Sequence, residues 1–296
     1  MPAKYKQLAD MLRRDAGKIQ EEGGSRLPTE MEIAASYSVS RQTVRSALKE
    51  LEDEGLIERR QGSGSYINPA RPVHSSDHIA VVTTFIDDYI FPSILHDAQR
   101  IFSDHGYSTL VYTTENSVGK ENEILSELLY REIDAILIEG SRTAYPTPNT
   151  SLFTGLRKRG IPVLFLHGKY SNLPGFPSVL DDNVGGGYQL GKYLIGKGHT
   201  QIAGIFKSDD SQGPERYFGV ISAMTDSQIR INDSRFCWYD TEDRKDILSG
   251  DRLGGTKLSR FIDERLGDAT ALVCYNDEIA YAAIQHLLRR GRTIPE

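Results

Sequence analysis

Apolar residues recur at two different spacings along the 296-residue chain, and the change between them divides it into two parts. At first the apolar positions stand three and four apart, as on the buried face of a helix. From His78 onward, short continuous apolar runs alternate with stretches of helical spacing. The first part is therefore predicted to be a small helical domain of residues 1–68. The second, residues 78–296, is predicted to be an α/β domain, with residues 69–77 as a linker.

Helix-capping residues mark the elements of the small domain. A helix is expected over residues 4–22, and Thr29 with Glu32 has the spacing of a capping box at the start of a second helix. Ser40 is a good N-cap for a third helix. The residues expected to form the apolar sides are Met31, Ala34 and Ala35 on the second helix and Val44, Ala47, Leu48 and Leu51 on the third.

A short hairpin is predicted to follow the third helix. Gly55 stands where a glycine commonly ends a helix. Two short strand-like runs, 56–60 and 65–67, then flank the loop Gln-Gly-Ser-Gly at 61–64. Helix, helix-turn-helix and hairpin in this order predict a winged helix-turn-helix, whose third helix would enter the major groove of DNA with its polar N-terminal residues.

Several strings in this domain resemble the GntR family of bacterial regulators. They are Leu-Pro-Thr-Glu at 27–30, Val-Ser-Arg-Gln-Thr-Val-Arg at 39–45 and the Gly-Ser-Gly wing at 62–64. The resemblance implies that Arg41 and Arg45 reach bases or phosphates of operator DNA, and that Glu30 accepts from a cytosine amine. It also implies phosphate contacts near the N-terminus and a wing close to the minor groove. The implied DNA-binding residues are Lys4, Tyr5, Glu30, Ser40, Arg41, Gln42, Thr43, Arg45, Gln61 and Gly62.

Net charge contributes little to this interpretation. The first seventy residues hold eleven Lys and Arg against eleven Asp and Glu, and the whole chain has a formal net charge of −6. A neutral domain can bind DNA if its cations gather on one face, but non-specific binding should then be modest.

The second part is predicted to consist of two α/β lobes. The pattern of strand and helix begins at His78 and starts again at Ser178, so the first lobe is expected at about 78–177 and the second at about 178–296. Two such lobes create a cleft at the carboxyl ends of their strands. The expected strands are 79–85, 108–112, 133–139, 162–166, 178–181, 202–206, 236–239 and 271–275. The expected helices are 94–105, 121–131, 152–159, 183–198, 214–226, 255–266 and 277–290.

The strings Leu-Asp-Asp-Asn-Val-Gly-Gly-Gly at 180–187 and Tyr-Asn-Asp-Glu-Ile-Ala at 275–280 resemble the LacI/GalR-type effector domains. This resemblance implies that the polar residues near the strand ends recognise a sugar. A pentose offers hydroxyls that donate and accept and an apolar ring face, so its site needs charged groups that form paired hydrogen bonds, and an aromatic platform. Arg216 can donate as a fork, Asn276 can donate and accept, and Phe91 or Tyr89 can stack on the ring. The candidate ligand-binding residues are Phe91, Tyr89, Glu139, His167, Lys207, Asp209, Arg216 and Asn276.

The LacI/GalR-type effector domains are related to periplasmic sugar-binding proteins, and the resemblance extends over almost all of residues 78–296. The similar strings are Leu-Asp-Asp-Asn-Val-Gly-Gly-Gly at 180–187, Gly-His-Thr at 198–200, Arg216 with Gly219, and Tyr-Asn-Asp-Glu-Ile-Ala at 275–280. The resemblance implies a homodimeric transcriptional repressor that binds operator DNA and responds to a sugar, L-arabinose or a related one. It also implies a further strand and crossover segments beyond Glu296, so we expect the second lobe to be incomplete in this chain.

Alternatives remain at this point. The effector could be another pentose, a purine or a sugar phosphate. The sequence shows no dense cluster of Arg and Lys at the cleft, and this absence argues against a phosphorylated ligand. An enzyme with a regulatory head is a second alternative, but no nucleophile motif supports it. The glycines of 186–192 resemble a phosphate-binding loop, yet Tyr193 stands where Ser or Thr is required, so we expect them to let a helix pack close to its sheet.

Other features exclude further classes of protein. No apolar run approaches the ~20 residues of a membrane span and no signal peptide is seen, so a cytoplasmic location is expected. Cys237 and Cys274 are expected to be reduced core residues. His74 and His78 are four apart but lie in the linker, so neither a metal nor a cofactor is expected.

Overall fold

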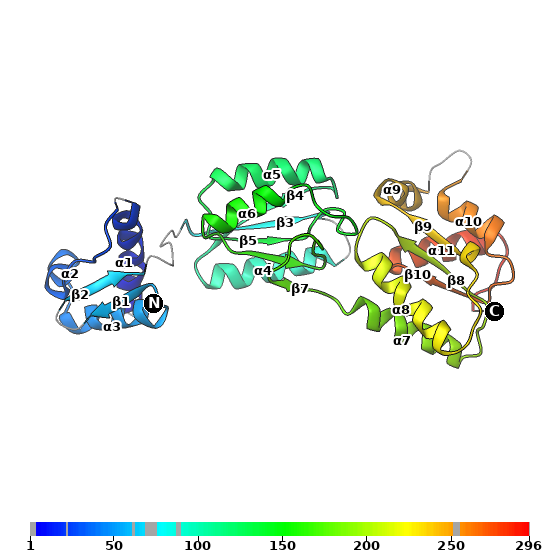
Figure 1. Ribbon diagram of the computed structural model, residues 1–296, viewed down its shortest axis with the longest axis horizontal. Helices are drawn as coiled ribbons and strands as arrows, with labels where there is room; N and C mark the ends of the chain where they lie inside the picture. Colours follow the sequence, from blue (N-terminus) through cyan, green and yellow to red (C-terminus); the bar gives the residue numbers. More distant parts are fainter. Residues whose placement is uncertain are drawn as a thin grey trace.

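The computed structural model describes residues 4–21, 23–60, 63–68, 76–86, 90–250 and 255–295. These residues form a head, a first lobe and a second lobe, which follow one another along the long axis of the molecule (Figure 1). Four positions discussed above, Gln61, Gly62, His74 and Tyr89, lie outside the described residues. None of the described helices is long and apolar enough to cross a membrane.

The head has the predicted winged helix-turn-helix elements. They are α1 (Lys4–Glu21), α2 (Glu30–Ser36), α3 (Arg41–Asp53), and the antiparallel strands β1 (Ile57–Arg60) and β2 (Gly64–Ile67). The capping box of Thr29 and Glu32 is present, and Ser40 caps α3 by accepting from the Thr43 N–H. Both predicted helix starts are therefore confirmed.

The core of the head differs from the prediction at one helix. The four apolar residues predicted for α3 are all buried. On α2, however, Ile33 is the buried residue, whereas Met31 is 63% exposed and Ala35 is also exposed. Ala34 packs against the head core as predicted, so the predicted apolar side of α2 was right at Ala34, wrong at Met31 and Ala35, and missed Ile33.

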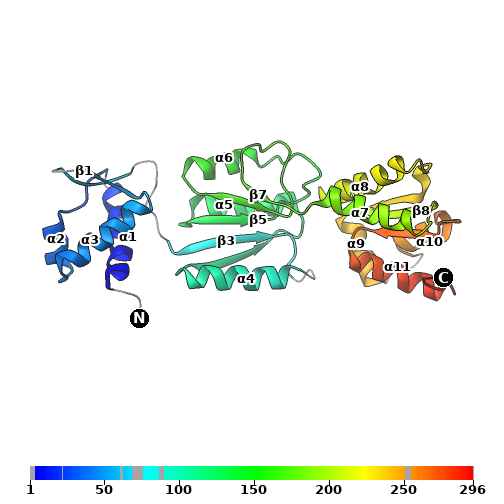
Figure 2. The ribbon, with the colours of Figure 1, turned by 90° about the horizontal axis from the view of Figure 1, so that it is seen from below.

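The first lobe is a five-stranded parallel sheet in the order β4-β3-β5-β6-β7. Helices α5 and α6 cover one face and α4 covers the other (Figures 1 and 2). The side chains of α5 and α6 complete a core with the sheet that includes Leu125, Leu128, Phe153 and Leu156. The elements are β3 (His78–Thr83), α4 (Phe91–Asp104), β4 (Ser108–Thr113), α5 (Val118–Tyr130), β5 (Ala135–Ile138), α6 (Thr150–Lys158), β6 (Val163–Leu166) and β7 (Ser178–Val179).

The boundary between the lobes is displaced from its predicted place. Strand β7 pairs in parallel with β6 through Phe165 and Leu166, so it is the last strand of the first sheet. The prediction that a strand at Ser178 opens the second lobe was wrong. The pattern of apolar runs cannot assign a two-residue strand to a sheet, because that depends on which neighbour it pairs with. The chain enters the second lobe after this strand, through residues 180–182 (Figure 2).

Among the described residues, the second lobe has a three-stranded parallel sheet in the order β10-β8-β9. Helix α9 was not predicted, because its short sequence is mostly polar and buries only Thr241 and Ile247. The elements are α7 (Asn183–Gly196), β8 (Ile202–Lys207), α8 (Gln212–Asp226), a 3-10 turn (Asp233–Arg235), β9 (Phe236–Tyr239), α9 (Thr241–Ser249), α10 (Lys257–Arg265), β10 (Ala271–Cys274) and α11 (Asp277–Arg289).

Gly187 and Gly191 of α7 lie at a contact between two helices. A Cβ atom at Gly187 would lie 2.2 Å from the carbonyl oxygen of Arg216, and one at Gly219 would lie 2.2 Å from that of Val184. Glycine therefore lets α7 and α8 approach backbone to backbone. We expected these glycines to bring α7 close to its sheet. This expectation was wrong, because the glycines bring α7 close to helix α8 instead.

Candidate functional site

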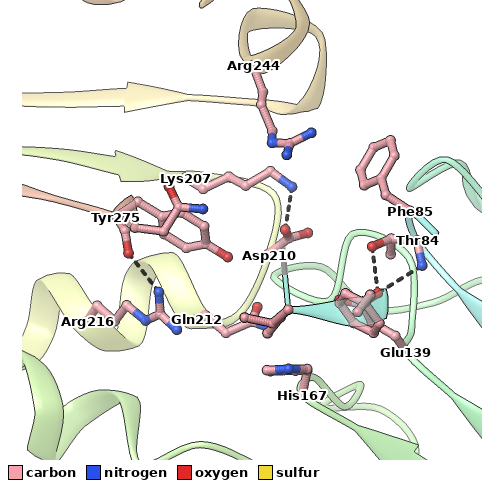
Figure 3. Close-up of a pocket in the computed structure, with 13 residues that line it drawn as sticks. Thr84, Phe85, Glu139, His167, Lys207, Asp210, Gln212, Arg216, Arg244 and Tyr275 are labelled. Carbon is pink, nitrogen blue, oxygen red and sulfur yellow. Dashed lines mark hydrogen bonds and ion pairs between the residues drawn. The ribbon is translucent and has the colours of Figure 1, made fainter. Parts of the chain in front are cut away.

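A pocket lies between the two lobes, at the carboxyl ends of their strands. It holds about 570 Å³ of free space, part of it open to solvent. Figure 3 shows side chains of both lobes pointing into it. The lining residues are Thr84, Phe85, Ile90, Phe91, Glu139 and His167 of the first lobe and Lys207, Asp210, Gln212, Arg216, Arg244, Tyr275 and Asn276 of the second.

Glu139 is the principal acceptor on the first-lobe wall. It follows β5, and its Oε2 accepts from the Thr84 N–H at 2.8 Å, from the Thr84 hydroxyl at 2.6 Å and from the Thr83 hydroxyl at 3.2 Å. Burial raises the pKa of the Glu139 carboxyl. Within the described part of the chain Oε1 accepts no hydrogen bond from protein, so this atom is available to a ligand hydroxyl.

Aromatic side chains form part of the pocket lining. The Phe91 ring lies 5.5 Å from that of His167, at an angle of 49°. His167 is held in turn by a 2.7 Å contact from Nδ1 to Asp181. The Arg244 guanidinium lies 5.2 Å above the Phe85 ring. Phe91 and Phe85 therefore offer apolar ring faces beside hydrogen-bonding groups, as a sugar site requires.

Arg216 and Lys207 are fixed on the second-lobe wall by protein acceptors. Arg216 donates from Nε to Asn183 Oδ1 at 2.8 Å and from NH1 to the Tyr275 carbonyl at 2.7 Å. Lys207 is 3% exposed, and its ammonium donates to the Asp210 carboxylate (Figure 3). Asp210 compensates the buried charge of Lys207, and the two neutral acceptors fix the orientation of the Arg216 guanidinium.

Two amides complete this wall. The Oδ1 atom of Asn276 accepts from the Ile279 N–H at 3.1 Å and caps α11, which leaves its Nδ2 group as a donor. The Oε1 atom of Gln212 is buried and accepts no hydrogen bond from the described residues. A buried acceptor without a partner is costly, so a ligand donor would be favourable at this point.

The structure brings six of the eight predicted ligand residues to the pocket: Phe91, Glu139, His167, Lys207, Arg216 and Asn276. Asp209 is not among the lining residues. It is buried, and its Oδ2 accepts from the N–H and the hydroxyl of Thr241 at the start of α9. The structure therefore does not bring Asp209 to the pocket, because a strand-end position does not tell which way a side chain points.

Sequence reasoning missed seven lining residues: Thr84, Phe85, Ile90, Asp210, Gln212, Arg244 and Tyr275. Most of them neighbour a predicted residue in the same loop, so widening each strand-end position by a few residues would have found them. Arg244 lies on α9 and gave no such signal. With Lys207 and Arg216 it makes three cations in the lining, so the inference that the cleft lacks a cluster of Arg and Lys was wrong.

Several of the predicted DNA-binding residues lie at or near the N-terminal end of α3. Arg41 and Gln42 are exposed there, while Ser40 and Thr43 are joined to each other through the cap. Glu30 of α2 pairs with Arg45 of α3 at 3.0 Å and with Arg59 of the wing at 2.7 Å. Lys4 and Tyr5 lie in the first turn of α1, exposed and half-buried.

Family comparisons match both parts of the chain. Residues 4–67 match the model for "Bacterial regulatory proteins, gntR family". Residues 76–296 match that for "Periplasmic binding proteins and sugar binding domain of LacI family". The predicted GntR-type and LacI-type resemblances are both confirmed.

Curated relatives share this combination over most of the chain. The arabinose metabolism transcriptional repressor of Halalkalibacterium halodurans is 33% identical over 277 residues, which are 92% of this chain and 72% of the relative. The protein of the same description from Geobacillus stearothermophilus is 34% identical over 297 aligned positions, covering 99% of this chain and 79% of the relative. Both are repressors rather than enzymes.

Solved structures share the fold. The crystal structure of the transcription regulator CcpA of Lactococcus lactis has a TM-score of 0.60 at 24% identity and covers 74% of each chain. A putative ribose operon repressor from Burkholderia thailandensis has a TM-score of 0.58 at 22% identity, covering 75% of this chain and 77% of its own. At this level of identity the likeness supports the two-lobed fold alone.

Proposed function

The chain belongs to the LacI family of sugar-binding regulators and carries a GntR-family DNA-binding domain, and from this we propose that it is a repressor released from its operator by L-arabinose. The observation that carries the proposal is the pocket between the lobes. Both walls hold oriented donors and acceptors next to aromatic ring faces. This combination suits a small, uncharged polyol.

Three groups would take the sugar hydroxyls. Arg216 and the Nδ2 group of Asn276 donate from the second lobe, and Glu139 accepts from the first. Phe91 would lie against the apolar face of the ring. Because these groups come from different lobes, a sugar that contacts all of them binds the closed arrangement better and shifts the population toward it.

The head would read the operator through α3. Arg41, Gln42 and Arg45 stand at the end of that helix which enters the major groove in proteins of this fold. Two heads on a homodimer would bind a palindromic site, and sugar-driven closure would change their spacing and so weaken DNA binding. Such a repressor would work in the cytoplasm, with its operator.

A phosphorylated sugar or a purine is the second candidate for the effector. The observation that favours it is the presence of Lys207, Arg216 and Arg244 in one pocket lining. Each is already paired with a protein group: Lys207 with Asp210, Arg216 with Asn183, and Arg244 with Glu278. A dianion would have to compete with these partners, so we favour the neutral sugar.

Calorimetric titration of the full chain decides between these effectors. The panel would hold L-arabinose, other pentoses and hexoses, their phosphates, and purines. We expect L-arabinose to bind most tightly. In parallel, fluorescence anisotropy with duplexes selected from a random pool should show specific DNA binding that L-arabinose weakens. Tightest binding of a phosphate or a purine, or no effect of any sugar on DNA binding, would contradict the proposal.

A further inference from the structure

Beside the pocket, a set of buried polar side chains joins the two lobes directly. The Thr143 hydroxyl bonds to the Ser211 hydroxyl at 3.2 Å and accepts from the Ser211 N–H at 3.0 Å. The Ala144 N–H donates to the Asp209 carbonyl at 3.3 Å. We call these contacts, together with those of Asn116, the lobe junction.

Asn116 lies at the centre of the lobe junction and is 0% exposed. Its Nδ2 group donates to Asp210 Oδ1 at 3.0 Å and to the Thr241 hydroxyl at 2.6 Å, both in the second lobe. Its Oδ1 accepts from the Arg142 N–H at 2.6 Å in its own lobe. A backbone N–H only donates and a carboxylate only accepts, so these partners fix the orientation of the amide.

The backbone also points to a constrained junction. Glu115 and Asn116 have φ values of +50° and +55°, and Arg142 and His167 have +51° and +64°. All four follow strands of the first sheet at the edge that faces the second lobe. Non-glycine residues in this left-handed region persist where surrounding contacts hold them, and they gather at ligand sites and switches.

Asp210 connects the lobe junction to the pocket. One carboxylate oxygen accepts from Asn116 across the junction, and the other accepts from the Lys207 ammonium. Asp210 and Lys207 line the pocket, whereas Asn116 does not (Figure 3). Asn116 therefore touches the binding site only through Asp210, and only while the lobes are together.

We propose that Asn116 is a positioning residue that couples lobe closure to the effector pocket, by holding Asp210 and, through it, Lys207. When the lobes separate, Asp210 loses its donor from the first lobe and the pocket loses one of the constraints on its second-lobe wall. This inference rests on the proposed function, because it assigns the link between closure and the binding of that sugar.

Asn116→Asp is the sharpest test. Aspartate accepts the left-handed backbone and keeps an acceptor for the Arg142 N–H, but it sets a carboxylate against that of Asp210. We expect L-arabinose to bind about tenfold or more weakly, since a charge-assisted hydrogen bond is replaced by repulsion. Asn116→Gly, which also tolerates this backbone, removes the side chain without adding charge, so it should lose less affinity.

Hydrogen exchange of the full chain, measured without sugar, reports whether the hydrogen bonds of the lobe junction are formed. The amides of Ala144 and Ser211 donate across the lobes, so they should exchange faster in Asn116→Asp, whereas strand amides such as those of Ala80 and Ile205 should not change. The double variant Asn116→Asp with Asp210→Asn reverses the donor and the acceptor, and it should recover much of the protection. The matched control is Asn122→Asp, which alters an amide contact within the first lobe only and should leave both amides and the affinity as in the wild type.

The outcomes separate this inference from the proposed function. Wild-type exchange at Ala144 and Ser211 together with unchanged affinity in Asn116→Asp would overturn the inference. An equal loss in Asn122→Asp would also overturn it, because the effect would then reflect the stability of the first lobe. If the wild type binds no L-arabinose, the proposed effector is wrong, and the exchange measurements without sugar still decide whether Asn116 joins the lobes.

Discussion

The head and the pocket are built from very different spans of the sequence. The candidate DNA-binding surface of the described head uses residues close together in the chain, and one carboxylate, Glu30, ties the recognition helix to the wing. The pocket instead collects residues from Thr84 to Asn276 through two sheets. Local signals therefore define the first surface, while the second depends on how strands and lobes are placed. If this contrast is correct, substitutions in one region should leave the other intact.

The largest expected effect is on the stability of the head. Leu48 is 1% exposed in the head core, and Leu48→Ala should destabilise this domain by about 2–5 kcal/mol, because it removes buried methyl groups and leaves a cavity. Hydrogen exchange should show the head opening while calorimetry finds unchanged sugar affinity. A similar loss of sugar affinity would show that the pocket depends on the head, and the contrast would fail.

The next effect concerns the pocket alone. Arg216→Ala should weaken sugar binding by about 2 kcal/mol or more, because sugar hydroxyls in a buried site are left without their donor. Calorimetry gives the affinity, and DNA binding without sugar should remain at the wild-type level. Arg100→Ala, on the exposed side of α4, is the matched control. Unchanged affinity in Arg216→Ala would remove this residue from the site.

A comparable loss is expected on the DNA side. Arg45→Ala should cost about 1–3 kcal/mol of specific binding if Arg45 contacts a base, and sugar affinity should not change. Lys4→Ala should instead weaken binding to all sequences alike and lower the salt slope by about one. Anisotropy titrations at several salt concentrations measure both quantities. Equal affinity of wild type and Arg45→Ala for the selected duplex would refute the base contact.

The smallest effect tests the local character of the head. Thr29→Ala should cost about 1 kcal/mol, since it removes the N-cap of α2. The hydrogen bond from the Thr29 backbone N–H lowers the pKa of the Glu32 carboxyl. Because the pKa of Glu32 is lower in the folded state than in the unfolded state, its carboxylate stabilises the fold when the pH is above the unfolded-state pKa. This stability is lost as the pH falls through the folded-state pKa.

Melting of Glu32→Gln at several acidic pH values tests this link. The head of the wild type should lose stability as Glu32 becomes protonated, and the variant should lose less over the same range. Parallel pH profiles of the two proteins would mean that the capping box carries no proton linkage.

Much of the architecture follows from local physical chemistry. Thr29 with Glu32 and Ser40 mark helix starts because their side chains satisfy backbone N–H groups a few residues away, which needs no tertiary context. The strands from His78 to Leu166 could be predicted because an apolar run between polar turns has few alternatives. Strand-end positions likewise identified four residues of the pocket lining, namely Glu139, His167, Lys207 and Asn276.

Only the tertiary structure decided the pairing of the shortest strand and the direction of individual side chains. Ser178–Val179 joins the first sheet because β6 offers it a pairing edge, and no local pattern names the partner of so short a strand. Asp209 and Asp210 are neighbours of one type, yet the first accepts from Thr241 at the start of α9 and the second pairs with Lys207 and Asn116. The direction of each side chain depends on donors more than thirty residues away in the sequence, Thr241 for Asp209 and Asn116 for Asp210, which only the folded lobes bring within hydrogen-bonding distance.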